Sequence, residues 1–270
     1  MEVRAKKALG QHFLTDGQIA RRIVDTLQAG VPGGGVLEVG PGMGVLTQFL
    51  LEREGLDLKA VELDGESVAW LRKHYPALGD GLIEGDFLRM DLETLFPGPF
   101  AVIGNFPYNI SSQIFFKILE QRDRIPEVVC MIQKEVAERI AEKPGTKTYG
   151  ILSVFLQAWY DIEYVFSVGP GAFNPPPKVQ SAVIRLTRNA RAALPCDERL
   201  FREIVKNAFG QRRKTLRNSL RSIAVRALGE EAAAAVLADP VFDLRPERLG
   251  VEDFCDLALR FGGEIPSQKH

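Results

Sequence analysis

The stretch that decides the fold is Val36-Leu37-Glu38-Val39-Gly40-Pro41-Gly42-Met43-Gly44. Its first four residues form a short, largely apolar run, which is typical of a buried strand. Three glycines follow at alternate positions, where a helix is predicted to begin. Glycine lets a ligand approach the backbone closely at such a sharp strand-to-helix turn. The stretch therefore predicts a strand, a ligand-binding turn and a helix.

Strand-like and helix-like segments alternate over the first two thirds of the chain. The predicted strands are 36–39, 58–63, 82–85, 101–103 and 128–132, and the predicted helices are 18–29, 45–54, 66–73 and 112–121, the last with Ser111 or Ser112 as N-cap. This alternation predicts an α/β fold with a mostly parallel sheet and helices on both faces. Segments 161–168 and 181–187 are strand-like without a helix between them, so we expect an antiparallel hairpin at the sheet edge.

The last part of the chain is predicted to be helical. Residues 189–196 resemble a linker, and helical patterns follow over 200–209, 213–227, 230–237 and 251–261. We therefore expect two domains, 1–188 and 189–270, the second small and all-α. Nine Lys and Arg residues lie between Arg199 and Arg226 against one acid, Glu203, although the whole chain has a net charge of −1. This local excess suits a polyanion, and a solvated helix face is the competing interpretation.

Composition limits the class of protein. The chain has 270 residues and 46% apolar residues, enough for one α/β domain and a smaller one. No run approaches the roughly 18 apolar residues of a membrane span. Residues 1–7 are not followed by an apolar signal core, so we expect a cytoplasmic protein. The three cysteines, Cys130, Cys196 and Cys255, are far apart, which favours reduced, buried thiols over disulfides or a metal site.

Three acids stand at the ends of three successive predicted strands: Glu38, Glu62 and Asp86. The carboxyl ends of parallel strands meet at one edge of the sheet, so these acids are expected to converge there. Glu62 occupies the usual place of a carboxylate that binds two ribose hydroxyls, and Asp86 can accept a hydrogen bond from an adenine amine. Glu38 would repel a pyrophosphate but attract a cation such as S-adenosylmethionine. The spacing Gly-x-Gly-x-Gly also disfavours a dinucleotide-dependent dehydrogenase.

The fourth predicted strand is followed by Asn105-Phe106-Pro107-Tyr108. The side-chain oxygen of Asn105 can accept a hydrogen bond from an exocyclic amine. Pro107 disfavours helix at Phe106, whose carbonyl can then stay exposed. Tyr108 offers a flat ring on which a base can stack. An ordinary strand-end turn is the alternative, but together with the three acids the tetrapeptide predicts an S-adenosylmethionine-dependent amino-methyltransferase with these four catalytic residues.

The chain closely resembles the bacterial KsgA/RsmA family of ribosomal RNA adenine dimethyltransferases, which is related to the Erm-type enzymes. The segments that carry the resemblance are 10–14, 38–44, 61–64, 85–86, 104–112, 133–137, 173–181 and 208–220. The last of them favours the small-subunit enzymes over the Erm branch. The resemblance implies a Rossmann-like class I methyltransferase fold with a seven-stranded sheet. It also implies dimethylation of the N6 amines of two adjacent adenosines in a hairpin loop near the 3′ end of small-subunit (16S) rRNA, linked to subunit biogenesis.

The resemblance also implies roles for individual residues. Together with the strand-end acids, it places the cofactor against His12, Leu14, Glu38, Gly40, Gly42, Glu62, Asp86, Phe87 and Asn105. It implies that Phe173 packs near the target base and that Lys178 lies beside the RNA path. Tyr108 is expected to stack on the base, and the basic surface adds Arg212, Arg213, Lys214 and Arg217. His12 stands where the family more often has asparagine, and Phe106 where leucine is usual; contacts made by the backbone would survive both changes. We expect a monomer whose partner is the small-subunit precursor.

The predicted mechanism needs little from the protein beyond positioning. Hydrogen bonds from the target amine to the Asn105 side chain and the Phe106 carbonyl would favour a pyramidal nitrogen aimed at the methyl group. No strong general base and no metal are required, and the chain has only three histidines. Three alternatives remain open: an adenine-specific DNA methyltransferase, an Erm-like enzyme of large-subunit RNA, and a ribosome-assembly factor in which binding matters more than catalysis.

Overall fold

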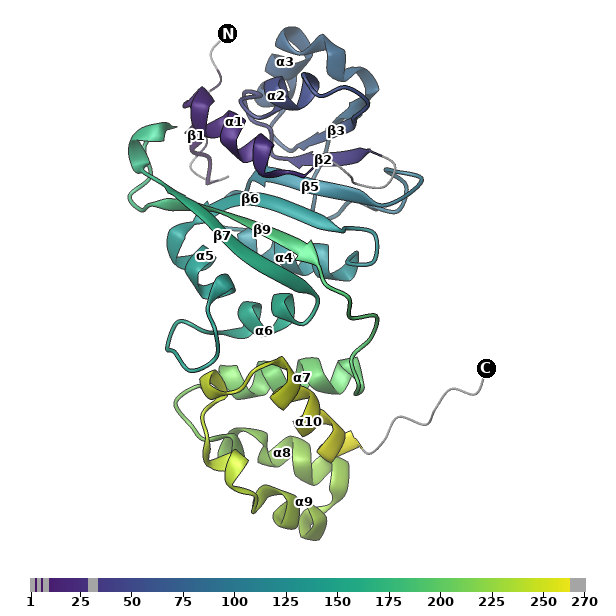
Figure 1. The fold of residues 1–270 in the computed structure, drawn as a ribbon, viewed down its shortest axis with the longest axis vertical. Coiled ribbons are helices and arrows are strands. Elements are labelled where there is room, and N and C mark those ends of the chain that lie inside the picture. The colour runs from purple at the N-terminus through teal and green to yellow at the C-terminus, as the bar shows by residue number, and fades with distance from the viewer. Residues whose placement is uncertain (1–2, 4–5, 7–9, 29–33, 263–270) are drawn as a thin grey trace. The chain divides into compact units, whose positions relative to one another are not determined.

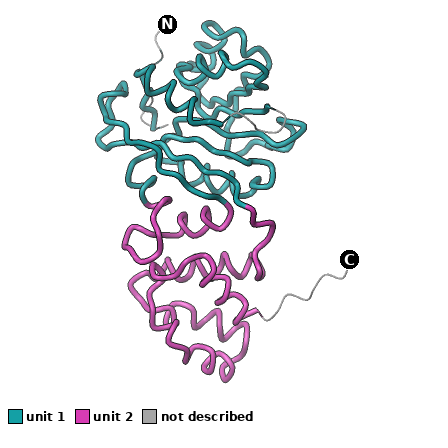
Figure 2. The backbone as a smooth tube through the Cα atoms, viewed as in Figure 1, with its two compact units in different colours: residues 1–138, 160–189 teal, residues 139–159, 190–270 magenta. Residues whose placement is uncertain are grey.

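The computed structural model describes residues 3, 6, 10–28 and 34–262. The chain forms two compact units, shown in Figure 2: Met1–Glu138 with Tyr160–Asn189, and Arg139–Trp159 with Ala190–His270. The second unit therefore includes a segment, 139–159, that the sequence placed in the first domain. The reason is aromatic packing within the second unit, where Phe155 lies against Phe201 at a ring-centroid distance of 6.2 Å. The separate roles expected for 1–188 and 189–270 stay a prediction.

The first unit is built around one sheet (Figure 1). Its elements are β1 (Phe13–Leu14), α1 (Gly17–Thr26), β2 (Gly35–Val39), α2 (Thr47–Leu51), β3 (Asp57–Glu62), α3 (Gly65–His74), β4 (Leu82–Glu84), β5 (Phe100–Asn105), α4 (Ser111–Glu120), β6 (Glu127–Gln133), β7 (Tyr160–Val168), β8 (Phe173–Asn174) and β9 (Ser181–Arg188). Seven strands form this sheet in the order β4-β3-β2-β5-β6-β9-β7. The first five are parallel, and β9 runs antiparallel to both of its neighbours, β6 and β7, which confirms the predicted fold class and edge hairpin.

The strand order contains a topological switch between β2 and β5. From β2 the chain moves outward through β3 to β4, and it then returns to form β5 on the other side of β2. Ligands bind at the carboxyl ends of strands beside such a switch, because the loops diverge there. The backbones approach closely at this point, since a Cβ on Gly104 would lie only 2.4 Å from the carbonyl oxygen of Val39. The glycine loop after β2 and the tetrapeptide after β5 are thus neighbours.

Both faces of the sheet are covered. On one face, Val36, Ile103 and Met131 pack with helices α1 and α2 in a single buried cluster. Strand side chains alternate between faces, and Val102 and Cys130, on the opposite face, are also fully buried. Figure 1 shows α1 in front of the sheet and α4 behind it. The central strands are therefore rigid supports for the loops at their ends.

The predicted N-cap of α4 is wrong. The N-cap is Ile110, which makes no side-chain capping bond, and Ser111 is already the first helical residue. Its hydroxyl donates instead to the carbonyl oxygen of Tyr108 at 3.4 Å. The serine thus ties the helix to the end of the preceding tetrapeptide.

The second unit is all helical. α5 (Lys134–Ala141) leads into it from β6, and it contains α6 (Ile151–Gln157), α7 (Glu198–Gly210), α8 (Leu216–Leu228), α9 (Glu230–Leu237) and α10 (Val251–Gly262). Aromatic rings form much of its core, for example Phe242 stacked on Phe261 at 5.9 Å. α8 begins at Leu216 and not at Arg213, so residues 211–215 form the turn between α7 and α8. Over the described ranges, no helix is long and apolar enough to cross a membrane.

Candidate active site

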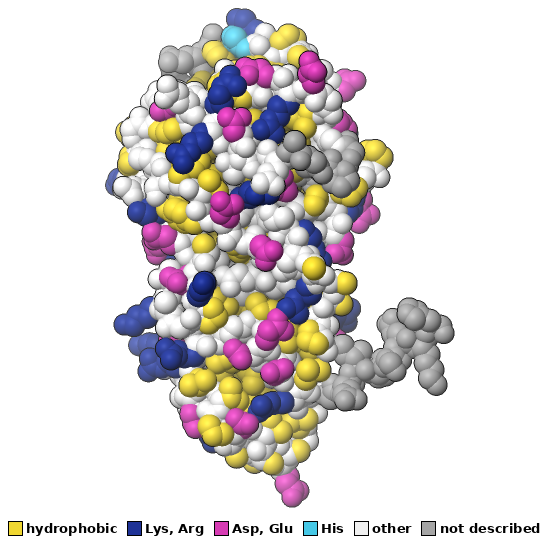
Figure 3. Space-filling view, viewed as in Figure 1, with side chains coloured by type: hydrophobic (Ala, Val, Ile, Leu, Met, Phe, Trp, Pro, Cys, Tyr) yellow, Lys and Arg dark blue, Asp and Glu magenta, His cyan; other side chains and the backbone are white. Residues whose placement is uncertain are grey.

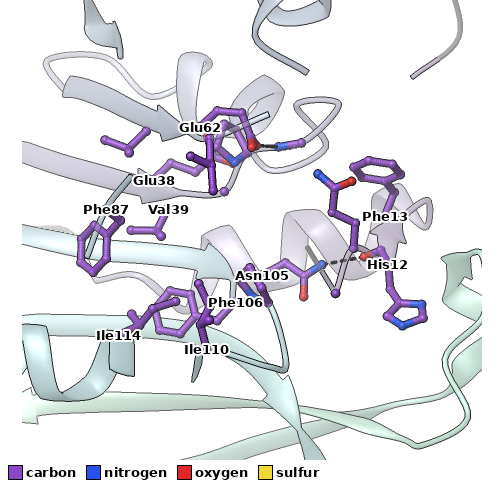
Figure 4. Close-up of a pocket in the computed structure, with 18 of the residues that line it drawn as sticks. His12, Phe13, Glu38, Val39, Glu62, Phe87, Asn105, Phe106, Ile110 and Ile114 are labelled. Carbon is purple, nitrogen blue, oxygen red and sulfur yellow. Dashed lines mark hydrogen bonds between the residues drawn. The ribbon is translucent and has the colours of Figure 1, made fainter. Parts of the chain in front are cut away.

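A pocket opens at the switch point between β2 and β5 (Figure 4). Most of its lining comes from five chain segments, 10–14, 38–43, 61–63, 85–88 and 105–110, and Val45, Leu46 and Ile114 complete it. The lining includes every residue predicted to bind the cofactor, as well as Phe106, Pro107 and Tyr108. In Figure 4, Glu38 and Glu62 lie on one side of the pocket, and Asn105 and His12 lie on the other. Residues up to 104 positions apart in the sequence, Gly10 and Ile114, therefore share one site.

The glycine loop has a backbone that other residues would rarely adopt. Gly40, Gly42 and Gly44 all have positive φ, at 68°, 57° and 84°. The loop is also braced from outside the pocket: a Cβ on Gly44 would lie 2.3 Å from the ring of Tyr75, and the indole nitrogen of Trp70 donates to the carbonyl oxygen of Met43 at 3.2 Å. The glycines are thus needed for the turn itself, and α3 and its C-cap hold the turn in place.

Glu38 is a buried acid with one free oxygen. Its side chain is 1% exposed, and Oε2 accepts a hydrogen bond from the Thr47 hydroxyl at 2.6 Å. Oε1 is buried without a hydrogen-bond partner among the described residues. Burial raises the pKa of this carboxyl to about 8, which the hydrogen bond from Thr47 only partly offsets. A buried acceptor without a partner favours a ligand that brings a donor or a positive charge.

Glu62 fastens the glycine loop to the end of β3. Its carboxylate accepts backbone hydrogen bonds from Gly42 and from Asp64, both at 2.9 Å. Burial raises the pKa of Glu62, and these backbone donors counter the effect. The remaining lone pairs can still accept from hydroxyl groups of a ligand in the pocket.

Asp86 behaves differently from the other two acids. Its Oδ1 accepts from the backbone nitrogen of Leu88 at 3.0 Å, and Oδ2 lies 3.4 Å from the exposed guanidinium of Arg89. The three acids thus line one pocket as predicted, with Glu38 the most buried. Carboxylates in this number fit a cationic ligand that carries hydroxyls and an amine, and they do not fit a pyrophosphate.

The amide of Asn105 is held in one orientation. Its Nδ2 donates to the main-chain carbonyl oxygen of His12 at 3.0 Å. A carbonyl can only accept, so the nitrogen must face His12, and Oδ1 is left to accept from another group. Phe106 is 1% exposed and packs edge-on against Phe115 at 5.8 Å. The aromatic side chain thus packs into the core, and Phe106 also lines the pocket.

Tyr108 stands half-buried at the far end of the tetrapeptide. Its hydroxyl shares a hydrogen bond with the hydroxyl of Ser181 at the start of β9. Burial raises the pKa of the phenol, more than the bond to Ser181 lowers it, so the ring stays neutral at ordinary pH. Its face lies against the imidazole of His12, with ring centroids 5.5 Å apart.

The structure separates the two remaining residues of the predicted target-base region from the pocket lining. Phe173 is 4% exposed and belongs to the main hydrophobic cluster, where β8 pairs with β1 and sets Phe173 opposite Leu14. Lys178 is exposed in the segment before β9. Their proposed contacts with RNA stay predictions.

Ion pairs neutralise part of the basic surface of the second unit. Arg217 lies 2.7 Å from Asp243, Arg226 2.6 Å from Glu203 and Arg212 3.8 Å from Glu247. Asp243 and Glu247 lie outside the stretch 199–226, so a count of charges within that stretch overstates its positive charge. Arg213 and Lys214 are exposed in the turn between α7 and α8, and no described acid lies within 4.0 Å of them. On the face drawn in Figure 3, Lys and Arg side chains gather along one side of this unit.

Sequence reasoning missed several residues of the site. Thr47, Trp70 and Tyr75 support the acids and the glycine loop, but none of them belongs to a recognisable motif. Gln11 and Leu63 also line the pocket, and Leu63 is 53% exposed there. The position of Leu63 directly after Glu62 is the sequence feature that could have indicated its place in the pocket. Within the described part of the chain, no group of three His, Cys, Asp or Glu side chains is arranged to hold a metal ion.

The fold and site together define a class I methyltransferase. In this sheet order, one cofactor pocket is formed by the glycine loop after β2 and by the acids at the ends of β3 and β4. The amide of Asn105, at the end of β5, is directed into the same pocket.

Comparisons with known proteins narrow this class. The family model for Ribosomal RNA adenine dimethylase matches residues 2–246. Ribosomal RNA small subunit methyltransferase A of Parabacteroides distasonis is 58% identical over 270 residues, covering 99% of this chain and 96% of its own. The protein of the same name from Bacteroides thetaiotaomicron is 59% identical over 256 residues, covering 94% and 93%. The chain belongs to the ribosomal RNA adenine dimethylase family.

Solved structures agree with this fold. A dimethyladenosine transferase from Plasmodium falciparum superimposes with a TM-score of 0.77 at 24% identity, covering 93% of this chain and 97% of its own. The 23S rRNA methyltransferase ErmE gives 0.64 at 26% identity, covering 92% and 99%. The predicted family, the enzyme class and the use of S-adenosylmethionine are confirmed.

Proposed function

We propose that this protein transfers methyl groups from S-adenosylmethionine to the N6 amines of two adjacent adenosines near the 3′ end of small-subunit rRNA. The observation that carries the proposal is the fixed amide of Asn105 beside a pocket lined by buried acids. The small subunit is favoured because full-length relatives at 55–59% identity carry the name small subunit methyltransferase A. The similar 23S enzyme shares only 26%.

The acids and the glycine loop would hold the cofactor. Glu62 would accept from ribose hydroxyls, Asp86 from the adenine amine, and Glu38 would face the cationic end of the ligand with its unpartnered oxygen. S-adenosylmethionine supplies a methyl group that is already activated on a sulfonium. The protein therefore has to align the target amine and exclude water.

Asn105 and Phe106 would act on the target amine. The bond from Nδ2 to His12 leaves the Oδ1 of Asn105 as an acceptor. The Phe106 carbonyl would supply a second acceptor, and two such bonds would localise the nitrogen lone pair. Tyr108 would hold the base by stacking after it leaves its own stack. The methylated amine is acidic enough to lose its proton to water, so the site needs no strong base.

The second unit would bind RNA through residues that the ion-pair network leaves free. Arg213 and Lys214 suit this role best, because Arg212 and Arg217 already face acids. We further propose that the protein acts in the cytoplasm as a monomer on the small-subunit precursor. The first unit would then contribute the chemistry and the second unit affinity for RNA.

Methyl transfer to purified subunits tests the proposal. Small and large subunits that lack the modification would be incubated with labelled S-adenosylmethionine, and the modified nucleotides mapped. We expect two adjacent dimethyladenosines near the 3′ end of the small-subunit RNA. Transfer only to large-subunit RNA, or a preference for DNA in direct competition, would contradict the proposal.

A further inference from the structure

Among the described residues, the imidazole of His12 contacts Tyr108 and Pro175, both away from the acidic side of the pocket. Its ring stacks on Tyr108, with centroids 5.5 Å apart and planes inclined by 29°. Its Nδ1 lies 2.9 Å from the carbonyl oxygen of Pro175. The carbonyl can only accept, so Nδ1 carries the proton of this hydrogen bond. The ring is therefore held between Tyr108 and the segment 173–181.

The main chain of His12 has a separate partner. Its carbonyl oxygen accepts from Asn105, the residue that would orient the target amine. In Figure 4 the carbonyl faces Asn105, whereas the imidazole turns away from it and from Glu38 and Glu62. Any residue could supply the carbonyl, but only an aromatic ring could supply the stacking contact.

The segment 173–181 contacts both β1, which follows His12, and Tyr108, on which the ring of His12 stacks. β8 pairs with β1 immediately after His12, and Ser181 shares a hydrogen bond with the hydroxyl of Tyr108. His12 closes this arrangement through Pro175. Tyr108 is thus held at two points by this segment. Ser181 binds its hydroxyl, and His12, which is bound to Pro175, stacks on its face.

We propose that the His12 side chain is a positioning residue for the target adenine, because it sets the angle of the Tyr108 ring and joins that ring to segment 173–181. This inference rests on the proposed function, since it needs a base that stacks on Tyr108. This role differs from the expectation that His12 binds the cofactor. The carbonyl of His12 orients Asn105, and its imidazole lies on the side of the pocket where the target base would stack. An asparagine at this position could keep the first contact but not the stacked ring.

Two substitutions separate the contacts of the ring. His12→Asn removes the stacked ring and keeps a donor that can reach Pro175, whereas His12→Phe keeps the ring and removes the donor. His74→Asn removes an imidazole outside the pocket: His74 stacks on Trp70 at 3.7 Å, and its Nδ1 lies 2.9 Å from the carbonyl oxygen of Trp70. Because Trp70 supports the glycine loop, this variant is a control whose effect, if any, falls on cofactor binding.

The assay measures kcat and KM for unmodified small subunits, the Kd for S-adenosylmethionine and the thermal midpoint. For His12→Asn we expect kcat/KM for RNA to fall about 3- to 10-fold, the range that one aromatic contact contributes. Cofactor Kd and thermal midpoint should stay near the wild-type values. His12→Phe should recover most of the loss. His74→Asn should leave kcat/KM for RNA at saturating cofactor near the wild-type value, and any effect should appear in the Kd for S-adenosylmethionine.

The outcomes distinguish this inference from the proposed function. A wild-type enzyme that does not modify small subunits would refute the function itself. If the wild type is active, unchanged RNA kinetics in His12→Asn would refute the role of the ring. A rise in cofactor Kd as large as the loss in RNA kcat/KM would refute it as well, since the ring would then serve the cofactor. Should His12→Asn fail to fold, His12→Phe alone decides: near wild-type RNA kinetics support the stacking role, and a loss as large as 10-fold refutes it.

Discussion

The burial of Glu38 links stability to pH in a way that can be measured. The carboxyl is 1% exposed, and burial raises its pKa from 4.5 to about 8. Between these two values the folded protein keeps a proton that the unfolded chain has lost. The contribution of this group to the free energy of unfolding is therefore fully present below pH 4.5, and it is lost as the pH rises toward 8.

The variant Glu38→Gln removes this titration with little change in shape, because its side-chain oxygen can still accept from Thr47. One pKa unit corresponds to about 1.4 kcal/mol. The stability of the variant relative to the wild type should therefore grow by about 3 kcal/mol between pH 5 and pH 8. Urea unfolding at several pH values without cofactor measures the difference. Glu120→Gln, at an exposed acid at the end of α4, is the control for the loss of one carboxylate from the surface.

Parallel stability curves for Glu38→Gln and the wild type would refute this reasoning. They would mean that the carboxyl ionises normally and that its free oxygen is solvated or paired. The unpartnered oxygen of Glu38 would then no longer argue for a ligand that brings a hydrogen-bond donor to this position.

Three further predictions concern the site and the RNA surface. Asn105→Ala should lower kcat at least about 100-fold, because the target amine loses its oriented acceptor. The Kd for S-adenosylmethionine, measured by calorimetry, should stay within a few-fold of the wild-type value. Retained methyl transfer would contradict this prediction. Neutralising Arg213 and Lys214 together should reduce the slope of log affinity for RNA against log salt by about 1.5 to 2, whereas Arg217→Gln, whose charge already faces an acid, should change it less. Trp70→Phe should weaken cofactor binding about 2- to 10-fold by removing one hydrogen bond to the glycine loop, with kcat unchanged; an equal effect on kcat would show a wider disturbance.

Much of the fold could be predicted because it depends on local patterns. Short apolar runs that end in glycine or an acid gave the strands, since buried parallel strands need continuous apolar sequence. The convergence of Glu38, Glu62 and Asn105 followed from one rule, that parallel strands end at the same edge of a sheet. These residues line one pocket in the structure.

The features that sequence could not predict depend on contacts between distant segments. Arg217 is neutralised by Asp243, 26 residues later, so a count of charge along the chain overstated the basic surface. β1 and β8 have two residues each, too short for any periodicity, yet their pairing brings His12 to Tyr108. The segment 139–159 joins the second unit through aromatic packing that no linker pattern marks.

The bond between Trp70 and Met43 has a practical consequence. The chain contains two tryptophans, and the other, Trp159, is buried in the second unit. The indole of Trp70 donates a hydrogen bond to the carbonyl of Met43, which lines the pocket. The fluorescence of Trp70 should therefore change when a ligand binds at the glycine loop. Trp159 would contribute a constant background. The protein thus carries an intrinsic fluorescent reporter, and titration of the unlabelled protein with ligand could follow occupancy of the pocket without catalysis.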